Sequence, residues 1–119
     1  MQGSTMQERR RQNRRKIGFY FQVLDTDTRE LFGHLTNVST LGFQLDCLRA
    51  VPLNATLRLS IETTAEVSDT EFIDLVVQSK WCRKDAITPN FFNAGFAILE
   101  ITPHDLEVLK RIVETYASQ

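Results

Sequence analysis

The sequence predicts an all-β domain in which six short antiparallel strands are followed by one C-terminal helix. Alternation of apolar and polar residues, the period of a strand with one buried face, recurs along most of residues 17–101. Turn-forming residues separate the alternating segments at regular intervals. Residues 103–117 change to helical spacing. Strands of this number and length are typical of a small barrel or sandwich.

Three strands are predicted in the first half of the chain. The first has four alternating apolar residues, which are Ile17, Phe19, Phe21 and Val23. The polar cluster at residues 25–28 predicts a turn, and a second strand is expected over residues 30–38. A third strand follows Gly42, and the break at residues 52–54 ends this half of the domain.

The second half predicts three further strands. Residues 55–62 alternate, and the polar residues 63–69 predict a loop. A long strand follows, and its predicted shared face is Ile73, Leu75, Val77, Ser79 and Trp81. After the turn at residues 88–90, the last strand is expected over residues 91–101.

One amphipathic helix is predicted at the end of the chain. Thr102 is suited to be its N-cap, Pro103 its first residue and Asp105 a favourable charge near the positive end of the helix dipole. Its apolar residues at helical spacing are Leu106, Leu109, Val113 and Tyr116. We expect this face to cover an open end or a seam of the sheet, or to serve a partner.

The composition is that of a single soluble domain. The chain has 119 residues, of which 42% are hydrophobic and 24% charged. No apolar run approaches the roughly 20 residues that a membrane span needs, so no membrane insertion is expected. Cys47 and Cys82 are too few for a disulfide framework and predict reduced thiols, which favours a cytoplasmic location.

The charge is distributed unevenly along the chain. Residues 1–16 carry six cations and one anion, a net charge of +5, whereas the remaining residues carry eight cations and fourteen anions, a net charge of −6. A basic arm on an acidic body indicates an anionic partner for the arm. Folding of the arm onto the body is the alternative that charge leaves open.

The basic arm contains an Arg-x-x-x-Arg pair, Arg10 and Arg14, which follows Arg9. A guanidinium group binds two phosphate oxygens at once, matches the O6 and N7 edge of guanine, and stacks on a purine ring. A ligand with phosphates and guanines can therefore use arginine in three ways. Taken alone, a basic run more often indicates a solvated segment or a general polyanion contact.

A second motif, Asn-x-Ser-x-x-Gly, covers residues 37–42. We expect the Asn37 and Ser39 side chains to point the same way and to offer hydrogen-bond donors and acceptors to a base edge. Gly42 can adopt a positive φ and lets another group approach the backbone closely. An ordinary hairpin turn uses the same residue types for backbone reasons.

Together, the basic pair and the Asn-x-Ser-x-x-Gly motif in a β-rich chain of this size resemble the PilZ domain family. The resemblance extends from residue 8 to residue 116, and residues 79–83 and 93–97 are similar to late-strand patterns of such domains. It implies a six-stranded antiparallel β-barrel with a C-terminal α-helix. Many members of the family are receptors for the bacterial second messenger cyclic di-GMP.

The resemblance implies a role for each motif residue. Arg10 and Arg14 would hold phosphate and contact guanine, and the barrel residues Asn37, Ser39 and Gly42 would receive a guanine edge. Asn37 stands where the family often has Asp, and a neutral amide makes weaker hydrogen bonds, so we expect lower affinity. We expect Arg9 to favour two stacked ligand molecules over one, although the sequence leaves the stoichiometry open.

We therefore expect a disordered tail over residues 1–8 and a single domain over residues 9–119. Within it, residues 9–16 form the arm, 17–102 the barrel and 103–117 the helix. Cyclic di-GMP is expected to order the arm over the barrel, and an unidentified effector protein would read this change. The process (motility, exopolysaccharide synthesis or virulence) and the oligomeric state, monomer or homodimer, are left open.

Two other kinds of binding protein share some of these features. The first is a PilZ-like adaptor that binds no nucleotide, which the intact set of five motif residues disfavours. The second is a DNA- or RNA-binding barrel, which the acidic body and the lack of interleaved surface aromatics disfavour.

No catalytic or metal-binding constellation is predicted, and no cofactor apart from the ligand. His34 and His104 lack neighbours at metal-ligand spacing, and Cys47 and Cys82 lack a paired histidine. The sequence contains no Gly-x-Ser-x-Gly elbow and no Gly-rich phosphate loop. Trp81 is expected to be a core or rim aromatic, with guanine stacking as a secondary role.

Overall fold

The computed structural model of the protein describes residues 15–16, as backbone, and residues 20–116. The predicted tail and residues 9–14 of the predicted arm lie outside them. The described elements are seven strands and one helix: β1 (Arg15–Lys16), β2 (Gln22–Asp25), β3 (Leu31–Val38), β4 (Gly42–Cys47), β5 (Thr56–Glu62), β6 (Phe72–Lys84), β7 (Phe92–Glu100) and α2 (Pro103–Tyr116).

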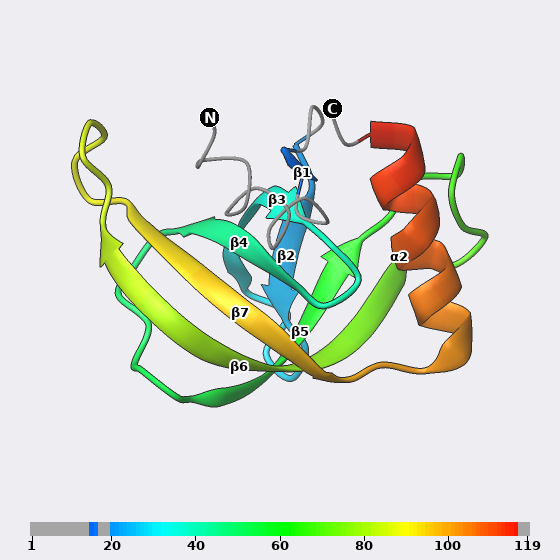
Figure 1. Cartoon of the computed structure of the whole chain (residues 1–119), viewed down its shortest axis with the longest axis horizontal. Coiled ribbons are helices and arrows are strands. Elements are labelled where there is room, and N and C mark those ends of the chain that lie inside the picture. The colour runs from blue at the N-terminus through cyan, green and yellow to red at the C-terminus, as the bar shows by residue number, and fades with distance from the viewer. Residues whose placement is uncertain (1–14, 17–19, 117–119) are drawn as a thin grey trace, which may run out of the picture.

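Six of these strands form a closed antiparallel barrel (Figure 1). Along the ring, β2 pairs with β5, β5 with β6, β6 with β7, β7 with β4, β4 with β3, and β3 with β2 again. Closure leaves no unpaired edge within the ring. The sequence pattern allowed a barrel or a sandwich, and the pairing of β3 with β4 makes it a barrel.

β1 is a two-residue addition beside the end of β3. Arg15 lies opposite Val38 and Lys16 opposite Asn37, whereas β2 pairs with the earlier part of β3, where Gln22 lies opposite His34. One edge of β3 is therefore shared between the strand that follows the basic arm and the first strand of the ring.

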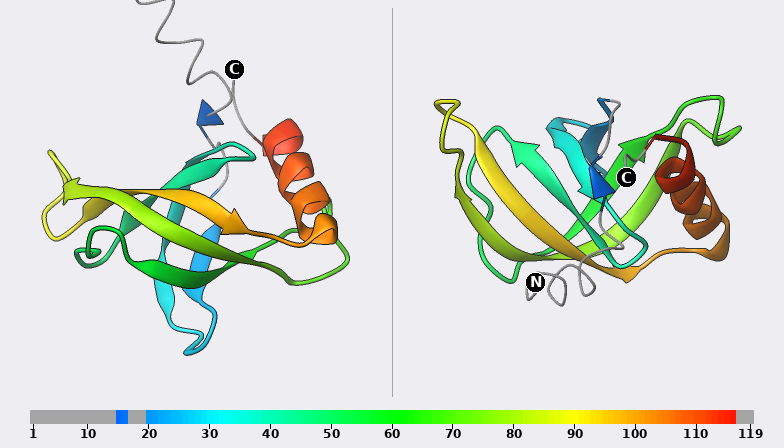
Figure 2. Two further views of the ribbon diagram at one scale, coloured as in Figure 1. Left: turned by 60° about the horizontal axis from the view of Figure 1, so that its bottom comes forward. Right: turned by 45° about the horizontal axis from the view of Figure 1, so that its top comes forward.

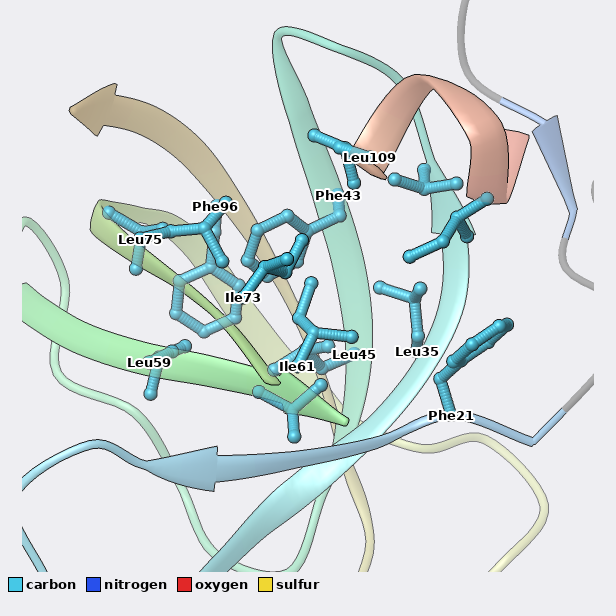
Figure 3. Close-up of a cluster of buried hydrophobic side chains, with 14 of the residues drawn as sticks. Phe21, Leu35, Phe43, Leu45, Leu59, Ile61, Ile73, Leu75, Phe96 and Leu109 are labelled. Carbon is cyan, nitrogen blue, oxygen red and sulfur yellow. The ribbon is translucent and has the colours of Figure 1, made fainter. Parts of the chain in front are cut away.

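Apolar side chains from the strands of the ring and from α2 fill the interior (Figure 3). The largest fully buried ones include Phe21, Phe43, Leu45, Leu59, Ile61, Ile73, Phe96, Leu109 and Ile112. Burial of each such side chain contributes about 1.5–3 kcal/mol. The alternation in the sequence correctly placed Phe21, Val23, Ile73, Leu75 and Val77 in this core.

The helix α2 lies against one open end of the barrel (Figure 2). The predicted N-cap is confirmed, because Thr102 Oγ1 accepts a hydrogen bond of 3.2 Å from the Asp105 N–H. The buried face is Val108, Leu109 and Ile112, and the flanking Tyr116 ring meets Phe21 edge-on at 5.1 Å. Within the described part of the chain, no helix has the length and apolar character needed to cross a membrane.

The predicted alternation of β6 is wrong at Trp81. The pairing with β7 shifts register between Ser79 and Trp81, so that Lys80 is an additional residue on β6. Cys82, opposite the fully buried Ala94, continues the inward face, and Trp81 lies on the outer face of the barrel beside Gly95. A bulge of one residue thus moves the indole from the predicted inner face to the outside.

His34 is a buried polar residue on the outer face of β3. Only 8% of its surface is exposed, because the Tyr20 ring stacks on it with 3.8 Å between ring centroids. Its Nδ1 has no hydrogen-bond partner among the described residues. Burial lowers the pKa of His34, and the neighbouring Asp46 carboxylate offsets this effect in part.

We expect acid to destabilise the fold partly through His34. The unfolded chain binds the histidine proton more readily than the folded chain does. The stability that neutral His34 contributes is therefore fully present above its ordinary pKa of 6.5 and is lost as the pH falls below that value. His34→Phe should therefore lose less unfolding free energy than the wild type between about pH 7.5 and about pH 5.5, measured by urea denaturation. His104→Gln is the control and should follow the wild type, and a wild-type slope in His34→Phe would contradict this assignment.

Candidate functional site

A transverse row of residues crosses the outer face of four strands. Asn37 on β3 lies opposite Gln44 on β4, Gln44 opposite Gly95 on β7, and Gly95 opposite Trp81 on β6. Residues that face each other across paired strands present their side chains on the same side of a sheet. We call these four residues the binding row. It joins one predicted site residue, Asn37, to an aromatic side chain far away in the sequence.

The amide oxygen of Asn37 is an acceptor to which no described group donates a hydrogen bond. Its Nδ2 donates to Gln44 Oε1 at 2.7 Å, which leaves Oδ1 as the remaining polar atom of the amide. Oδ1 is buried and has no hydrogen-bond partner among the described residues. A buried polar atom in this state costs about 1–3 kcal/mol. A ligand N–H directed at Oδ1 would remove this cost.

Ser39 holds the turn that joins β3 to β4. Its Oγ accepts hydrogen bonds from the Leu41 and Gly42 N–H groups at 3.1 and 3.2 Å, and its own N–H donates to the Gly42 carbonyl at 2.8 Å. The side chain is buried. The sequence predicts that the Ser39 and Asn37 side chains point the same way, but β3 ends at Val38, so the strand period does not extend to Ser39.

Gly42 serves the same turn with an ordinary backbone conformation. No glycine among the described residues has a positive φ, so the conformational freedom expected of Gly42 is not used. Its carbonyl accepts a hydrogen bond of 3.2 Å from Ser39 Oγ as well as the bond from the Ser39 N–H. Ser39 and Gly42 therefore support Asn37 by fixing the end of its strand.

Trp81 and Gly95 form the other end of the binding row. A Cβ atom on Gly95 would lie 2.2 Å from Trp81 Nε1, so the indole can rest on the strand only because position 95 is glycine. The Arg83 guanidinium lies 5.0 Å from the centroid of the indole ring. The sequence did not assign Trp81 to the site. A glycine in the middle of an alternating strand was the available signal, because such a glycine often marks the close approach of another group.

A second transverse row runs beside the first. It is formed by His34 on β3, Asp46 on β4, Asn93 on β7 and Arg83 on β6. The Asn93 amide donates to Asp46 Oδ1 at 2.8 Å and to Asp85 Oδ1 at 3.1 Å. The Asn93 amide is thus engaged with two carboxylates next to the binding row. The groups that the row itself offers to a ligand are its amides and its indole.

The predicted arginines Arg9, Arg10 and Arg14 lie outside the described residues. Arg15, the next residue after Arg14, lies opposite Val38, beside Asn37. The chain that leaves the basic arm therefore passes along the Asn37 end of the binding row.

The two cysteines are held in the packed part of the barrel. Burial raises the pKa of the Cys47 thiol to about 12, so it stays protonated at neutral pH. Cys82 Sγ accepts a hydrogen bond from the Val51 N–H at 3.4 Å. Among residues 15–16 and 20–116, no three His, Cys, Asp or Glu side chains are grouped as metal ligands.

Solved structures with the same fold include two bacterial proteins. The Bacillus subtilis inhibitor of motility (MotI/DgrA) has 16% sequence identity and a TM-score of 0.65, over 86% of this chain and 51% of its own. The chain thus spans about half the length of that protein. The PilZ domain of YcgR from Escherichia coli, solved with c-di-GMP, has 15% identity and a TM-score of 0.62, over 87% of each chain.

The likeness to these two structures shows the fold alone, whereas comparison of the sequence with protein families shows the family. A comparison with curated proteins found no match. The model of the PilZ domain matches residues 8–115, which include the basic arm, the whole barrel and nearly all of α2. This chain therefore belongs to the PilZ domain family.

Proposed function

We propose that this domain is a receptor for cyclic di-GMP that closes its basic arm over the ligand and signals to an effector protein. The proposal rests on the family, on the YcgR domain of the same fold that was solved with c-di-GMP, and on the chemistry of the binding row. In it, the protein is a binding module and not an enzyme.

The pairing of β1 with the end of β3 is the observation that carries the proposal. It brings the residue next to Arg14 opposite Val38 and its neighbour Lys16 opposite Asn37. Arginine side chains of the arm can then reach a ligand seated on the row, bind its phosphates in pairs and stack on its bases. The opposite charges of arm and body favour the closed arrangement once the ligand bridges them.

The amide end of the row suits the edge of guanine. Guanine carries N–H donors on N1 and N2, and Asn37 Oδ1 is an acceptor with no partner among the described residues. Gln44 Oε1 accepts a hydrogen bond from Nδ2, so Oδ1 is the amide atom left for a ligand N–H. Oδ1 is buried, and the ligand would reach it by displacing the groups that cover it. Ser39 and Gly42 would contribute by holding this end of β3 in place.

The indole end of the row suits the face of a base. Trp81 is half-buried on Gly95, and Arg83 lies close to the ring. Stacking of a base on an aromatic side chain contributes about 1–3 kcal/mol. In this proposal Trp81 therefore stacks on guanine, which is the secondary role expected from the sequence.

Calorimetry with cyclic di-GMP tests the function directly. We expect the wild type to bind at micromolar or lower concentration, and Arg14→Ala to bind about tenfold or more weakly, because a bidentate arginine contact is worth about 1–3 kcal/mol. Arg58→Ala, which removes an exposed arginine paired with Asp27, should bind like the wild type. If the wild type gives no binding heat at high micromolar ligand, the receptor proposal is wrong and the alternative, an adaptor that binds no nucleotide, is favoured.

Two substitutions of Asn37 test the guanine contact. Asn37→Ala removes the acceptor and should weaken binding about tenfold, since a buried N–H of the ligand left without its acceptor costs roughly 1–3 kcal/mol. Asn37→Asp keeps an acceptor and adds charge, so it should bind at least as tightly as the wild type. Equal affinities of Asn37→Ala and the wild type would show that the base lies elsewhere.

The intrinsic fluorescence of the protein reports on the indole end. The chain has one tryptophan, so a change in its emission on titration with cyclic di-GMP can be assigned to Trp81. We expect quenching that saturates with the calorimetric affinity, and about tenfold weaker binding by Trp81→Ala. Unchanged emission at saturating ligand would exclude stacking on this ring.

A further inference from the structure

A hollow of about 590 Å³ lies between the loop after β4 and the hairpin that joins β6 to β7. We call it the hairpin pocket. Leu48, Phe91 and Phe92 supply apolar walls, and Arg49 and Lys84 supply charge. The hairpin projects at the opposite end of the molecule's longest dimension from α2 (Figure 1). No residue of the binding row lines this pocket.

The two cations of the hairpin pocket differ from all other cations of residues 20–116. Six of the eight have a partner in the chain: Arg29 on the Phe72 ring, Arg58 with Asp27, Lys80 with Gln78, Arg83 on the Trp81 ring, Lys110 with Glu107, and Arg111 with the Val67 carbonyl. Arg49 and Lys84 are the two without one, and both line the hairpin pocket. Unpaired positive charge is thus concentrated at one site of a body whose net charge is −6.

The carboxylate that also lines the pocket is engaged in the hairpin. Asp85 Oδ2 accepts hydrogen bonds from the Thr88 and Ile87 N–H groups at 2.7 and 3.0 Å, and Oδ1 accepts one from the Asn93 amide at 3.1 Å. The Thr88 N–H, followed by that of Ile87, lowers the pKa of Asp85. The same bonds use backbone donors that could otherwise bind a phosphate, which leaves Arg49 and Lys84 to receive an anion.

Arg49 also borders a smaller hollow of about 170 Å³ that Asp25 and Glu30 help to line. Asp25 Oδ1 accepts hydrogen bonds from the Asp27 and Thr28 N–H groups, and no ion pair joins either carboxylate to Arg49. The guanidinium is therefore available to a group that enters the hairpin pocket.

We propose that the hairpin pocket docks an acidic segment of a partner protein. One apolar side chain of the segment occupies the hollow against Leu48, Phe91 and Phe92, and flanking carboxylates pair with Arg49 and Lys84. Apolar walls beside two unpaired cations match this composition, whereas a phosphate backbone has no apolar side chain to place against those walls. Ile87, 88% exposed at the tip of the hairpin, extends the apolar surface available to the partner. A site of this size suits a weak, reversible complex.

Selection of random linear peptides displayed on phage, carried out on the full chain, tests this proposal. We expect the selected peptides to be enriched in Asp and Glu around one aromatic or large aliphatic residue. Synthetic copies should bind more weakly as salt rises, because exposed charge pairs are screened. Their affinity should fall about tenfold or more for the double variant Arg49→Glu/Lys84→Glu.

The matched control is the double variant Arg58→Glu/Lys110→Glu, which makes the same change of charge at two exposed cations that already have partners. It should bind the peptides within about twofold of the wild type. Circular dichroism should show both double variants folded, and both should keep the wild-type affinity for cyclic di-GMP, so failure of this proposal is separable from failure of the nucleotide proposal.

Peptides without acidic enrichment, or peptides that bind both double variants equally, would overturn the proposal. So would binding of inorganic phosphate, a short oligonucleotide or anionic lipid vesicles that is lost in Arg49→Glu/Lys84→Glu while no acidic peptide binds. That result would assign the pocket to a different anion.

Discussion

The pairing of β3 with β4 is the contact on which the rest of the structure depends. It closes the ring of strands, and it also places Asn37 opposite Gln44 at the start of the binding row. The strands approach so closely that a Cβ atom on Gly33 would lie 2.4 Å from the Asp46 carbonyl oxygen. The Ser39 hydroxyl fixes the turn between the two strands. Closure and site geometry are therefore set by the same hydrogen bonds.

The other edge of β3 links the barrel to the basic arm. β2 uses only the first part of this edge, which leaves its end to β1. In the proposed receptor this division of one edge is what allows a ligand to contact both the arm and the barrel. The barrel supplies a rigid amide and a rigid indole, and the arm supplies charge.

The proposed ligand and partner sites lie on different parts of the same barrel. The binding row runs across β3, β4, β7 and β6 and starts near the end of β3, and the hairpin pocket lies where β6 and β7 join. Asn93 connects the two regions, because its amide binds Asp46 beside the row and Asp85 in the hairpin. A domain of this size can in this way receive a nucleotide at one place and offer a separate surface to a protein.

The sequence by itself determined the order of strands and helix, the N-cap of the helix, the core residues of β4 and of most of β6, and membership of the family. These follow from local periods and short motifs, which depend on neighbours in the chain. Only the tertiary structure decided that the sheet closes, that Trp81 lies outside, and that the Ser39 hydroxyl is used within its turn. Closure also needs the pairings of β2 with β5 and of β4 with β7, which join strands far apart in sequence, and no local pattern encodes these registers or the register shift at Lys80.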